Sequence, residues 1–220
     1  MTTMDASSIV TTAPTPRSAV VALGDLAGRG FNFTPISFDD AVRDPSWRTD
    51  RRSTRLRSEP PGPPRPGGPF EVARRALIRY EAADPRIVRA VYDAREPLDG
   101  RDMLLVGRFL GLRFLMGVRV GDVVDRPEET AAGRVYRFAW NYRTLEGHLE
   151  EGQMDYELVK VDATGAIDFR IRSYSRMGKI ANPVVRWGFR LFGRREQVRF
   201  YERTVERLRT IVEERTTRST

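Results

Sequence analysis

The sequence predicts an α+β fold of the helix-grip type, in which a curved antiparallel sheet wraps around a long C-terminal helix. The first observation is that several segments between residues 103 and 175 alternate apolar and polar side chains with a period of two. The second is that the last part of the chain carries apolar residues three and four positions apart, as one face of a helix does. Sheets with one polar face are covered on the other face only. The final helix is therefore expected to cover the apolar face.

The first 70 residues predict a tail, a strand and a loop. Residues 1–30 are rich in Thr, Ser, Ala and Pro without periodicity, which is typical of a disordered tail. Residues 51–59 predict a first, polar strand. In residues 60–69 every position except Arg65 is Pro or Gly, and such a run favours an extended loop. We expect one domain over residues 31–215, with a second short tail at 216–220.

A pair of short helices is expected after the loop. The first is predicted from apolar residues at helical spacing: Phe70, Ala73, Leu77 and Tyr80. Asp84 and Pro85 interrupt this pattern, because Asp caps helices and Pro favours a first turn. A second short helix is predicted from Ile87, Val88, Val91 and Tyr92.

The strands of the expected sheet follow. From Met103 onward the pattern predicts strands, and residues 112–124 predict two strands or a bulged pair. Residues 155–161 and 166–175 predict two more strands, joined by a turn at 163–165. Between these two groups of strands lies the segment with the clearest alternation, whose apolar face is aromatic: Tyr136, Phe138, Trp140 and Tyr142. In the last strand Ile167, Phe169 and Ile171 share a face. The covering helix is predicted from Val184, Trp187, Leu191, Val198, Tyr201, Val205, Leu208 and Val212.

Composition and charge exclude some functions. Cysteine is absent, so disulfides, thiolate catalysis and thiolate metal sites are excluded. One histidine leaves too few ligands for a histidine-based metal centre, and we expect no metal and no cofactor. No apolar stretch is long enough to span a bilayer, and the expected location is cytoplasmic. Residues 170–220 hold 14 of the 38 Lys and Arg but only 5 of the 30 acidic residues, so the basic surface is local.

The single histidine, His148, lies in the stretch TLEGHLEEG, which covers residues 144–152. Two interpretations stay open. The imidazole could fix the backbone of a turn bracketed by Gly147 and Gly152. Alternatively, it could act as a general base beside a carboxylate such as Glu146, with Tyr142 nearby.

The same stretch carries a resemblance to a family catalogued as a domain of unknown function. That family has an aromatic strand running into T-L-x-G-H, then a Gly-Glu strand, then a Ser-x-Pro ending, and its signature can be written TLxGHxxxG. Here the corresponding segments are FAWNYRTLEGH, EEGQMDYEL and FRIRSYSR. The chain departs from the pattern where Gln153 and Met154 replace an acidic pair, and where Met177 replaces the proline. The family is similar to the Bet v 1 and START-like (SRPBCC) superfamily, which implies a cavity between the sheet and the long helix.

This resemblance and the aromatic face together predict a site for a hydrophobic small molecule. The expected ligand-binding residues are Tyr136, Phe138, Trp140, Tyr142, Phe169, Ile171, Arg172, Tyr174, Trp187 and Tyr201. One alternative is an enzyme of the cyclase or dehydratase type on the same scaffold, with His148, Glu146 and Tyr142 as candidate catalytic residues. The other is a basic surface that binds nucleic acid or an anionic membrane. We expect no specific nucleic-acid partner, because Glu residues are interspersed with the arginines of the last helix.

Overall fold

The computed structural model describes residues 9–11, 17–109, 112–131, 133–178 and 183–217, with the backbone alone at positions 9–11, 17–18, 108–109, 112 and 183–193. Among these residues the strands form one antiparallel sheet in the order β1-β3-β4-β5-β6-β7-β8-β2. Along the chain the elements are β1 (Ile9–Thr11), α1 (Arg17–Gly24), α2 (Phe38–Arg43), β2 (Arg48–Leu56), α3 (Pro69–Ile78), β3 (Val88–Asp93), β4 (Asp102–Phe109), β5 (Leu112–Thr130), β6 (Gly133–Thr144), β7 (Glu150–Val161), β8 (Ile167–Met177) and α4 (Pro183–Thr217).

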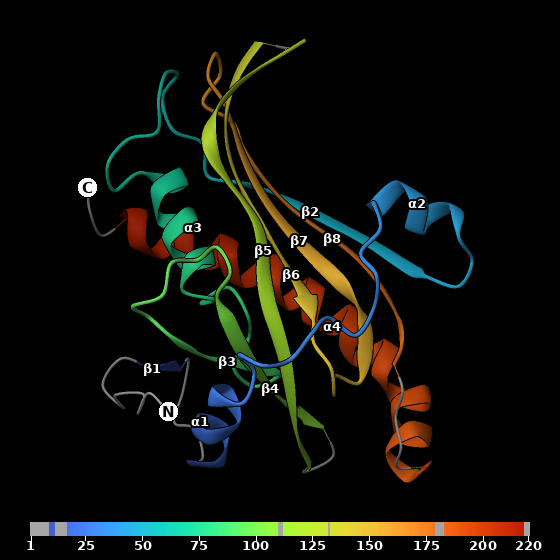
Figure 1. Cartoon of the computed structure of the whole chain (residues 1–220). Coiled ribbons are helices and arrows are strands. Elements are labelled where there is room, and N and C mark those ends of the chain that lie inside the picture. Colours follow the sequence, from blue (N-terminus) through green and yellow to red (C-terminus); the bar gives the residue numbers. More distant parts are fainter. Residues whose placement is uncertain (1–8, 12–16, 110–111, 132, 179–182, 218–220) are drawn as a thin grey trace.

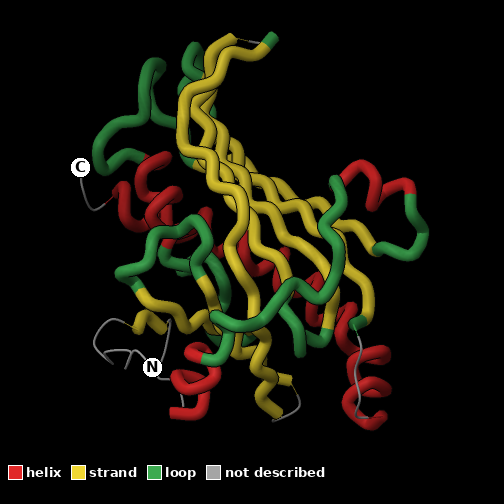
Figure 2. The backbone as a smooth tube through the Cα atoms, viewed as in Figure 1, coloured by secondary structure: helices red, strands yellow, loops and turns green. Residues whose placement is uncertain are grey.

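The sheet is strongly twisted and wraps around α4, which crosses behind it in Figure 1 and Figure 2. The pairing of β5 with β6 shifts register between Val120 and Val123, and irregularities of this kind bend a strand and increase its twist. The chain is therefore an α+β protein with the helix-grip architecture. The fold class predicted from the alternation and from the final apolar stripe is confirmed.

The main core lies between the concave face of the sheet, α3 and α4. The large side chains on this face of β6, β7 and β8 are buried as their alternation predicts. The helix contributes residues at three- and four-residue spacing, and the predicted Tyr201, Leu208 and Val212 are among them. The main cluster from sheet and helix includes Phe138, Trp140, Tyr142, Met154, Tyr156, Leu158, Ile167, Phe169, Ile171, Phe200, Tyr201, Leu208, Ile211 and Val212.

The segment from Ile87 to Tyr92 is where the element prediction was wrong. Instead of a second short helix, the structure has strand β3, which pairs with β4 from Val88 opposite Gly107 onward. A short apolar run does not distinguish a buried strand from a helix by its period. The β-branched Val88 and Val91 favour the extended form, and pairing with β4 decides the outcome.

Part of the segment that we expected to be disordered is ordered against the sheet. Helix α1 lies within residues 1–30, and Ala19, Leu23 and Leu26 are buried in a cluster with Leu104 and Leu145. Burial of these few apolar side chains offsets the cost of ordering the segment. Residues 1–8 and 12–16 of the predicted N-terminal tail lie outside the described residues. We propose that residues 17–217 form one folding unit, which extends beyond the 31–215 expected from the sequence.

The Pro/Gly loop at residues 60–69 is held by a buried lysine. Lys160 has no solvent exposure, and its Nζ donates hydrogen bonds to the carbonyl oxygens of Pro60 and Gly62. Its counter-charge is Glu59, whose Oε1 lies 3.5 Å from Nζ, and burial raises the pKa of Glu59. Pro69 then begins α3, where a missing backbone N–H costs nothing.

Replacing Lys160 should therefore destabilise the fold strongly. Lys160→Met leaves the Glu59 carboxyl buried without its cation and removes two donors from the loop. We expect a loss of about 3–5 kcal/mol in the free energy of unfolding, measured by urea denaturation. The exposed pair Arg55–Asp168 lies at the sheet edge, and Arg55→Met should cost at most about 1 kcal/mol. Equal losses in the two variants would contradict the conclusion that buried Lys160 holds the Pro/Gly loop in place.

Candidate functional site

Four aromatic residues meet in the interior between the sheet and α4. We call Tyr80, Trp140, Tyr142 and Tyr156 the aromatic cluster. Trp140 and Tyr156 are stacked, with ring centroids 4.8 Å apart, and Tyr80 lies edge-on to both at 6.4 Å. Phe169 of β8 stacks on the other side of Tyr156 at 6.3 Å. Offset-stacked and edge-on pairs of this kind are favourable beyond the area that they bury.

Tyr80 reaches the cluster through a left-handed backbone conformation. Its φ is 56°, the one positive value at a non-glycine position among the described residues. The N–H of Glu81 bonds the carbonyl of Ala76 and that of Tyr80 bonds the carbonyl of Leu77, which is the Schellman arrangement at the end of a helix. Glycine usually occupies this position, because a side chain there costs roughly 1–2 kcal/mol. The structure accepts this cost and places a tyrosine ring in the interior.

The cluster buries polar atoms that are only partly satisfied. The hydroxyls of Tyr80 and Tyr142 lie 3.5 Å apart, and Tyr142 also donates to Met154 Sδ at 3.3 Å. Within the described part of the chain, no group makes a full hydrogen bond with Tyr156 Oη or Trp140 Nε1, although the hydroxyls of Tyr80 and Tyr142 are close enough to Tyr156 Oη to shift its pKa. Burial raises the pKa of all three tyrosines, those of Tyr142 and Tyr156 strongly. The hydroxyls are therefore neutral and can donate.

The structure brings most of the predicted ligand-binding residues to this interior. Seven of them belong to the main core or pack against it: Tyr136, Phe138, Trp140, Tyr142, Phe169, Ile171 and Tyr201. Tyr136 is only partly buried, at the margin. Trp187 lies in the first turns of α4, and its side chain is outside the described residues. Two cluster members, Tyr80 and Tyr156, were not predicted. Tyr156 follows the alternation of β7, and Tyr80 belongs to the apolar helical pattern that begins at Phe70, although α3 itself ends at Ile78. Both patterns could therefore have predicted that these side chains face the interior.

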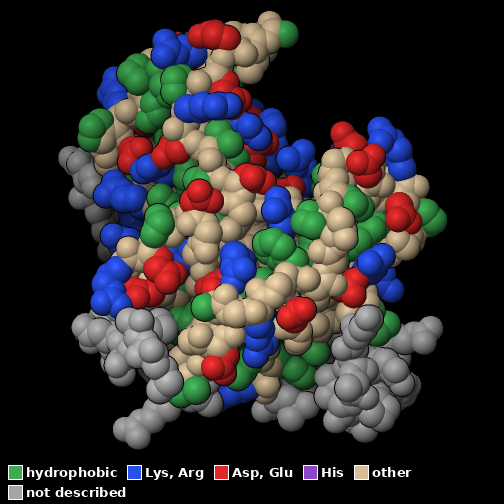
Figure 3. All heavy atoms as spheres, viewed as in Figure 1, with side chains coloured by type: hydrophobic (Ala, Val, Ile, Leu, Met, Phe, Trp, Pro, Cys, Tyr) green, Lys and Arg blue, Asp and Glu red, His purple; other side chains and the backbone are tan. Residues whose placement is uncertain are grey.

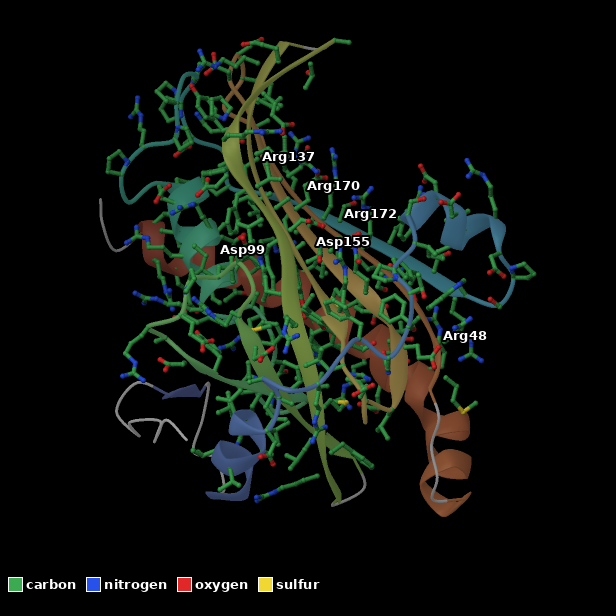
Figure 4. All side chains as sticks on the ribbon, in the orientation of Figure 1. Arg48, Asp99, Arg137, Asp155, Arg170 and Arg172 are labelled. Carbon is green, nitrogen blue, oxygen red and sulfur yellow. The ribbon has the colours of Figure 1, made fainter. Side chains whose placement is uncertain are left out.

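Arg172 and Tyr174 are on the opposite face of the sheet, contrary to the prediction. Side chains alternate along β8, so residues 172 and 174 cannot face the same way as Ile171. Arg172 lies 3.8 Å from Asp155 on the outer face, where both are labelled in Figure 4. Tyr174 packs edge-on against the rings of Phe33 and Trp47 beneath α2.

The stretch from Thr144 to Gly152 forms a tight turn held by the N-terminal segment. Thr144 Oγ1 donates to Asn32 Oδ1 at 2.6 Å and accepts from the N–H of Gly152 at 2.9 Å. His148 Nδ1 accepts the N–H of Glu150 at 2.9 Å, and burial lowers its pKa to about 4. A neutral imidazole bonded to the backbone favours the turn interpretation of this histidine.

The three candidate catalytic residues do not converge. His148 is buried in the turn, Glu146 is exposed, and Tyr142 lies in the interior cluster. Across the described residues no hydrogen bond or ion pair joins any two of them. Nor does the described part of the chain hold a group of three His, Asp or Glu side chains placed to bind a metal ion.

A second buried polar group joins α4 to the sheet near this turn. Gln197 of α4 donates to Ser175 Oγ at 2.9 Å and lies 3.3 Å from Glu150 Oε1. Arg194 forms an ion pair with the buried Asp50 of β2. Burial raises the pKa of Glu150 to about 7, although Ser175 and nearby arginines favour the charged form. Sequence reasoning missed this group, since its members come from four separate segments.

The arginines of α4 are largely matched by carboxylates. Three pairs lie along the helix surface: Arg199 with Glu196, Arg203 with Glu206, and Arg209 with Glu213. On the other face of the sheet, which is the face viewed in Figure 3, basic and acidic side chains are interspersed as well. Nucleic-acid surfaces need a basic patch of one sign, so this geometry does not favour one. Among the described residues, no helix is long and apolar enough to cross a membrane.

A curved antiparallel sheet closed on a long C-terminal helix, with an aromatic and apolar interior that holds a few hydroxyl groups, defines a helix-grip protein. The chain belongs to the family described as Domain of unknown function (DUF1990), whose model matches residues 37–199. The expectation of such a family is thereby confirmed, and the turn with His148 lies within the matched residues. No curated protein matches the chain.

Solved structures resemble the chain only distantly. Ara h 8.0201 is 8% identical and superposes with a TM-score of 0.41, covering 76% of this chain and 99% of its own. A protein of unknown function from Staphylococcus aureus is also 8% identical, with a TM-score of 0.44 and coverage of 79% and 99%. Likeness this distant carries no information about function.

The raised pKa of Glu150 predicts a pH-dependent stability. The folded state holds this proton up to about pH 7, whereas an ordinary Glu loses it near 4.5. Stability should therefore fall as pH rises from about 4.5 through 7, by about 1–3 kcal/mol. Urea unfolding at pH 5 and pH 8 measures the difference, and Glu150→Gln should shrink it. Glu151→Gln removes the neighbouring carboxylate, which pairs with Arg176, and should leave the Glu150 contribution in place. If the difference in unfolding free energy between pH 5 and pH 8 is unchanged in Glu150→Gln, Glu150 is not the group responsible for it.

Proposed function

We propose that this protein binds an apolar small molecule between the sheet and α4, with a hydrogen-bond acceptor of the ligand directed at the aromatic cluster. The observation that carries the proposal is the pair of buried polar atoms, Tyr156 Oη and Trp140 Nε1, without a partner in the described protein. Each such group costs about 1–3 kcal/mol when it is left unsatisfied. A ligand oxygen placed between them would recover that free energy.

The surroundings of these two atoms support a neutral ligand. Trp Nε1 is a donor only, and the tyrosine hydroxyls are neutral donors at any physiological pH. The neighbouring walls are apolar, with Phe138, Met154 and Ile171 close by in the same core. A carbonyl, ether or hydroxyl oxygen on a hydrophobic body fits both features. Apolar walls with a few placed polar groups are the usual composition of small-molecule sites.

Access to this interior requires side chains to move, because the rings are in contact. Tyr80 is the member that does not belong to the sheet, and it follows the last turn of α3 in a conformation that costs free energy. Strained backbone is concentrated at functional sites. A change of the Tyr80 backbone out of the left-handed conformation would relieve the strain and carry the ring out of the cluster, which supports this residue as the point of entry.

The alternatives have less support. An enzyme built on His148, Glu146 and Tyr142 would need these groups to converge on one substrate. A binder of nucleic acid or anionic membrane would need arginines of the last helix that are free of the carboxylates with which they pair.

Tyr156→Phe tests the proposal by separating stability from binding. Removing an unsatisfied buried hydroxyl should leave the free energy of unfolding unchanged or raise it. The same change should weaken binding of prodan, an apolar fluorescent ketone, about tenfold, because the ligand oxygen loses a donor. Fluorescence titration and urea denaturation of the same samples give both quantities.

Tyr136→Phe is the matched control, since this tyrosine lies on the same face at the margin of the core. It should leave prodan binding unchanged within about twofold. Native mass spectrometry of the purified protein adds a direct check for a co-purified small molecule. An absence of saturable prodan binding by the unaltered protein, together with a destabilised Tyr156→Phe, would mean a filled core and would refute the proposal.

A further inference from the structure

A separate cleft opens at the surface where the end of α3, the end of β3 and the C-terminal half of α4 meet. Its volume is about 710 Å³, which is in the range of sites for drug-sized ligands. Apolar side chains form part of the wall, among them Ile78, Pro85 and Tyr92. The charged residues in the lining are Arg79, Glu81, Arg101, Arg207 and Arg215.

The charge of this lining is strongly one-sided. Four guanidinium groups face the cleft, against one carboxylate among the described lining residues. That carboxylate, Glu81, lies 2.7 Å from Arg215 and 3.8 Å from Arg79. Arg207 donates its Nε to the backbone carbonyl of Glu81 at 2.8 Å, so its hydrogen bond neutralises no charge. A cleft with an excess of positive charge in its lining attracts anions, so an anionic ligand is expected here.

Arg101 is the lining arginine that is buried and held in place by hydrogen bonds. It is 6% exposed, and its guanidinium donates to the backbone carbonyls of Glu96, Pro97 and Ile78 at 2.6–3.4 Å. It also lies over the ring of Tyr92, 4.8 Å from the centroid. Burial lowers the pKa of Arg101. In the described structure no carboxylate forms an ion pair with it. The carboxylates of Glu96 and Asp93 are near enough to favour its charged form, but neither forms an ion pair with it, so they offset its positive potential in the cleft only in part.

Two acids near the cleft reduce this potential only in part, because each is paired with another arginine. Asp84 forms an ion pair with Arg86 at 2.8 Å, and Asp93 forms one with Arg95 at 2.7 Å. None of these four residues belongs to the described lining of the cleft.

We propose that this cleft binds an organic phosphate, with the phosphate group held by the arginines and the organic body against Ile78, Pro85 and Tyr92. Arginine suits this role, because its planar fork donates two parallel hydrogen bonds to phosphate oxygens. The volume exceeds what an inorganic phosphate ion fills, and the apolar part of the wall calls for an attached body. The site is independent of the neutral ligand proposed for the interior, since the residues that would hold each ligand differ.

Isothermal titration calorimetry with phenyl phosphate at constant ionic strength tests this site. We expect saturable binding of phenyl phosphate, weaker binding of inorganic phosphate, and none of phenol. Arg207→Gln should weaken phenyl phosphate binding about tenfold or more, because hydrogen bonds to charged groups contribute strongly. Glu81→Gln should strengthen it, since it removes the competing carboxylate from the lining.

Arg209→Gln and Glu213→Gln are the matched controls. They make the same charge changes on the same helix, in a pair that lies outside the lining of the cleft. Both should change the affinity by less than about twofold, because exposed charges at a distance are screened by salt. Prodan binding should be unaffected by Arg207→Gln, which separates this test from that of the interior.

Two results would overturn the inference. The first is an absence of saturable heat with phenyl phosphate. The second is equal weakening by Arg207→Gln and Arg209→Gln, which would show that phenyl phosphate responds to net charge and not to the cleft. Inorganic phosphate binding as tightly as phenyl phosphate would overturn the assignment of an organic body.

Discussion

The contact between the concave face of the sheet and one side of α4 is the interaction on which the rest of the structure depends. It buries the rings of β6 and β7 and the apolar stripe of the helix together, and burial of such rings is the largest favourable contribution to a core of this kind. The two faces of the sheet are covered differently. The helix covers one face, while α1, α2 and the segment joining α2 to α1 cover only parts of the other.

Burial on this scale requires a partner for every polar group that it encloses. Most of them have one. Lys160 binds two carbonyl oxygens of the Pro/Gly loop, Ser173 donates to the Tyr201 hydroxyl at 2.8 Å, and Asp50 pairs with Arg194. These contacts bind α4 and the Pro/Gly loop to three different strands of the sheet. Among the described residues, the buried side-chain atoms without a hydrogen-bond partner also include Asn141 Oδ1 and carboxylate oxygens of Glu59 and Glu81. Tyr156 Oη and Trp140 Nε1 differ from these in being neutral donors within the main core.

Sequence periodicity predicted the parts of the fold in which local pattern and tertiary environment agree. The aromatic face from Phe138 to Tyr142 and the stripe of the last helix are long enough for the period to be unambiguous. The segment at Ile87–Tyr92 is too short for that, and its pairing with β4 decided its state. The placement of Arg172 and Tyr174 beside Ile171 overlooked the alternation of the strand itself. Composition misled at α1, where Ala19, Leu23 and the following Leu26 are buried against the sheet.

The candidate sites were harder to predict, because their geometry depends on contacts between distant segments. The loop after α3 shows this most clearly. Tyr80 faces the interior only because the helix ends in a Schellman motif with a non-glycine residue in the left-handed position. Its neighbours Arg79 and Glu81 face the opposite way and line the cleft. Three consecutive residues thus contribute to two different environments, one neutral and aromatic, the other basic. An extended backbone at residues 79–81 would also place alternate side chains on opposite sides, without the cost of a positive φ. It could not directly follow α3, however, because that helix is packed against the core. The conformational cost at Tyr80 is the consequence of joining α3 to β3 while keeping an aromatic ring inside and charged groups outside.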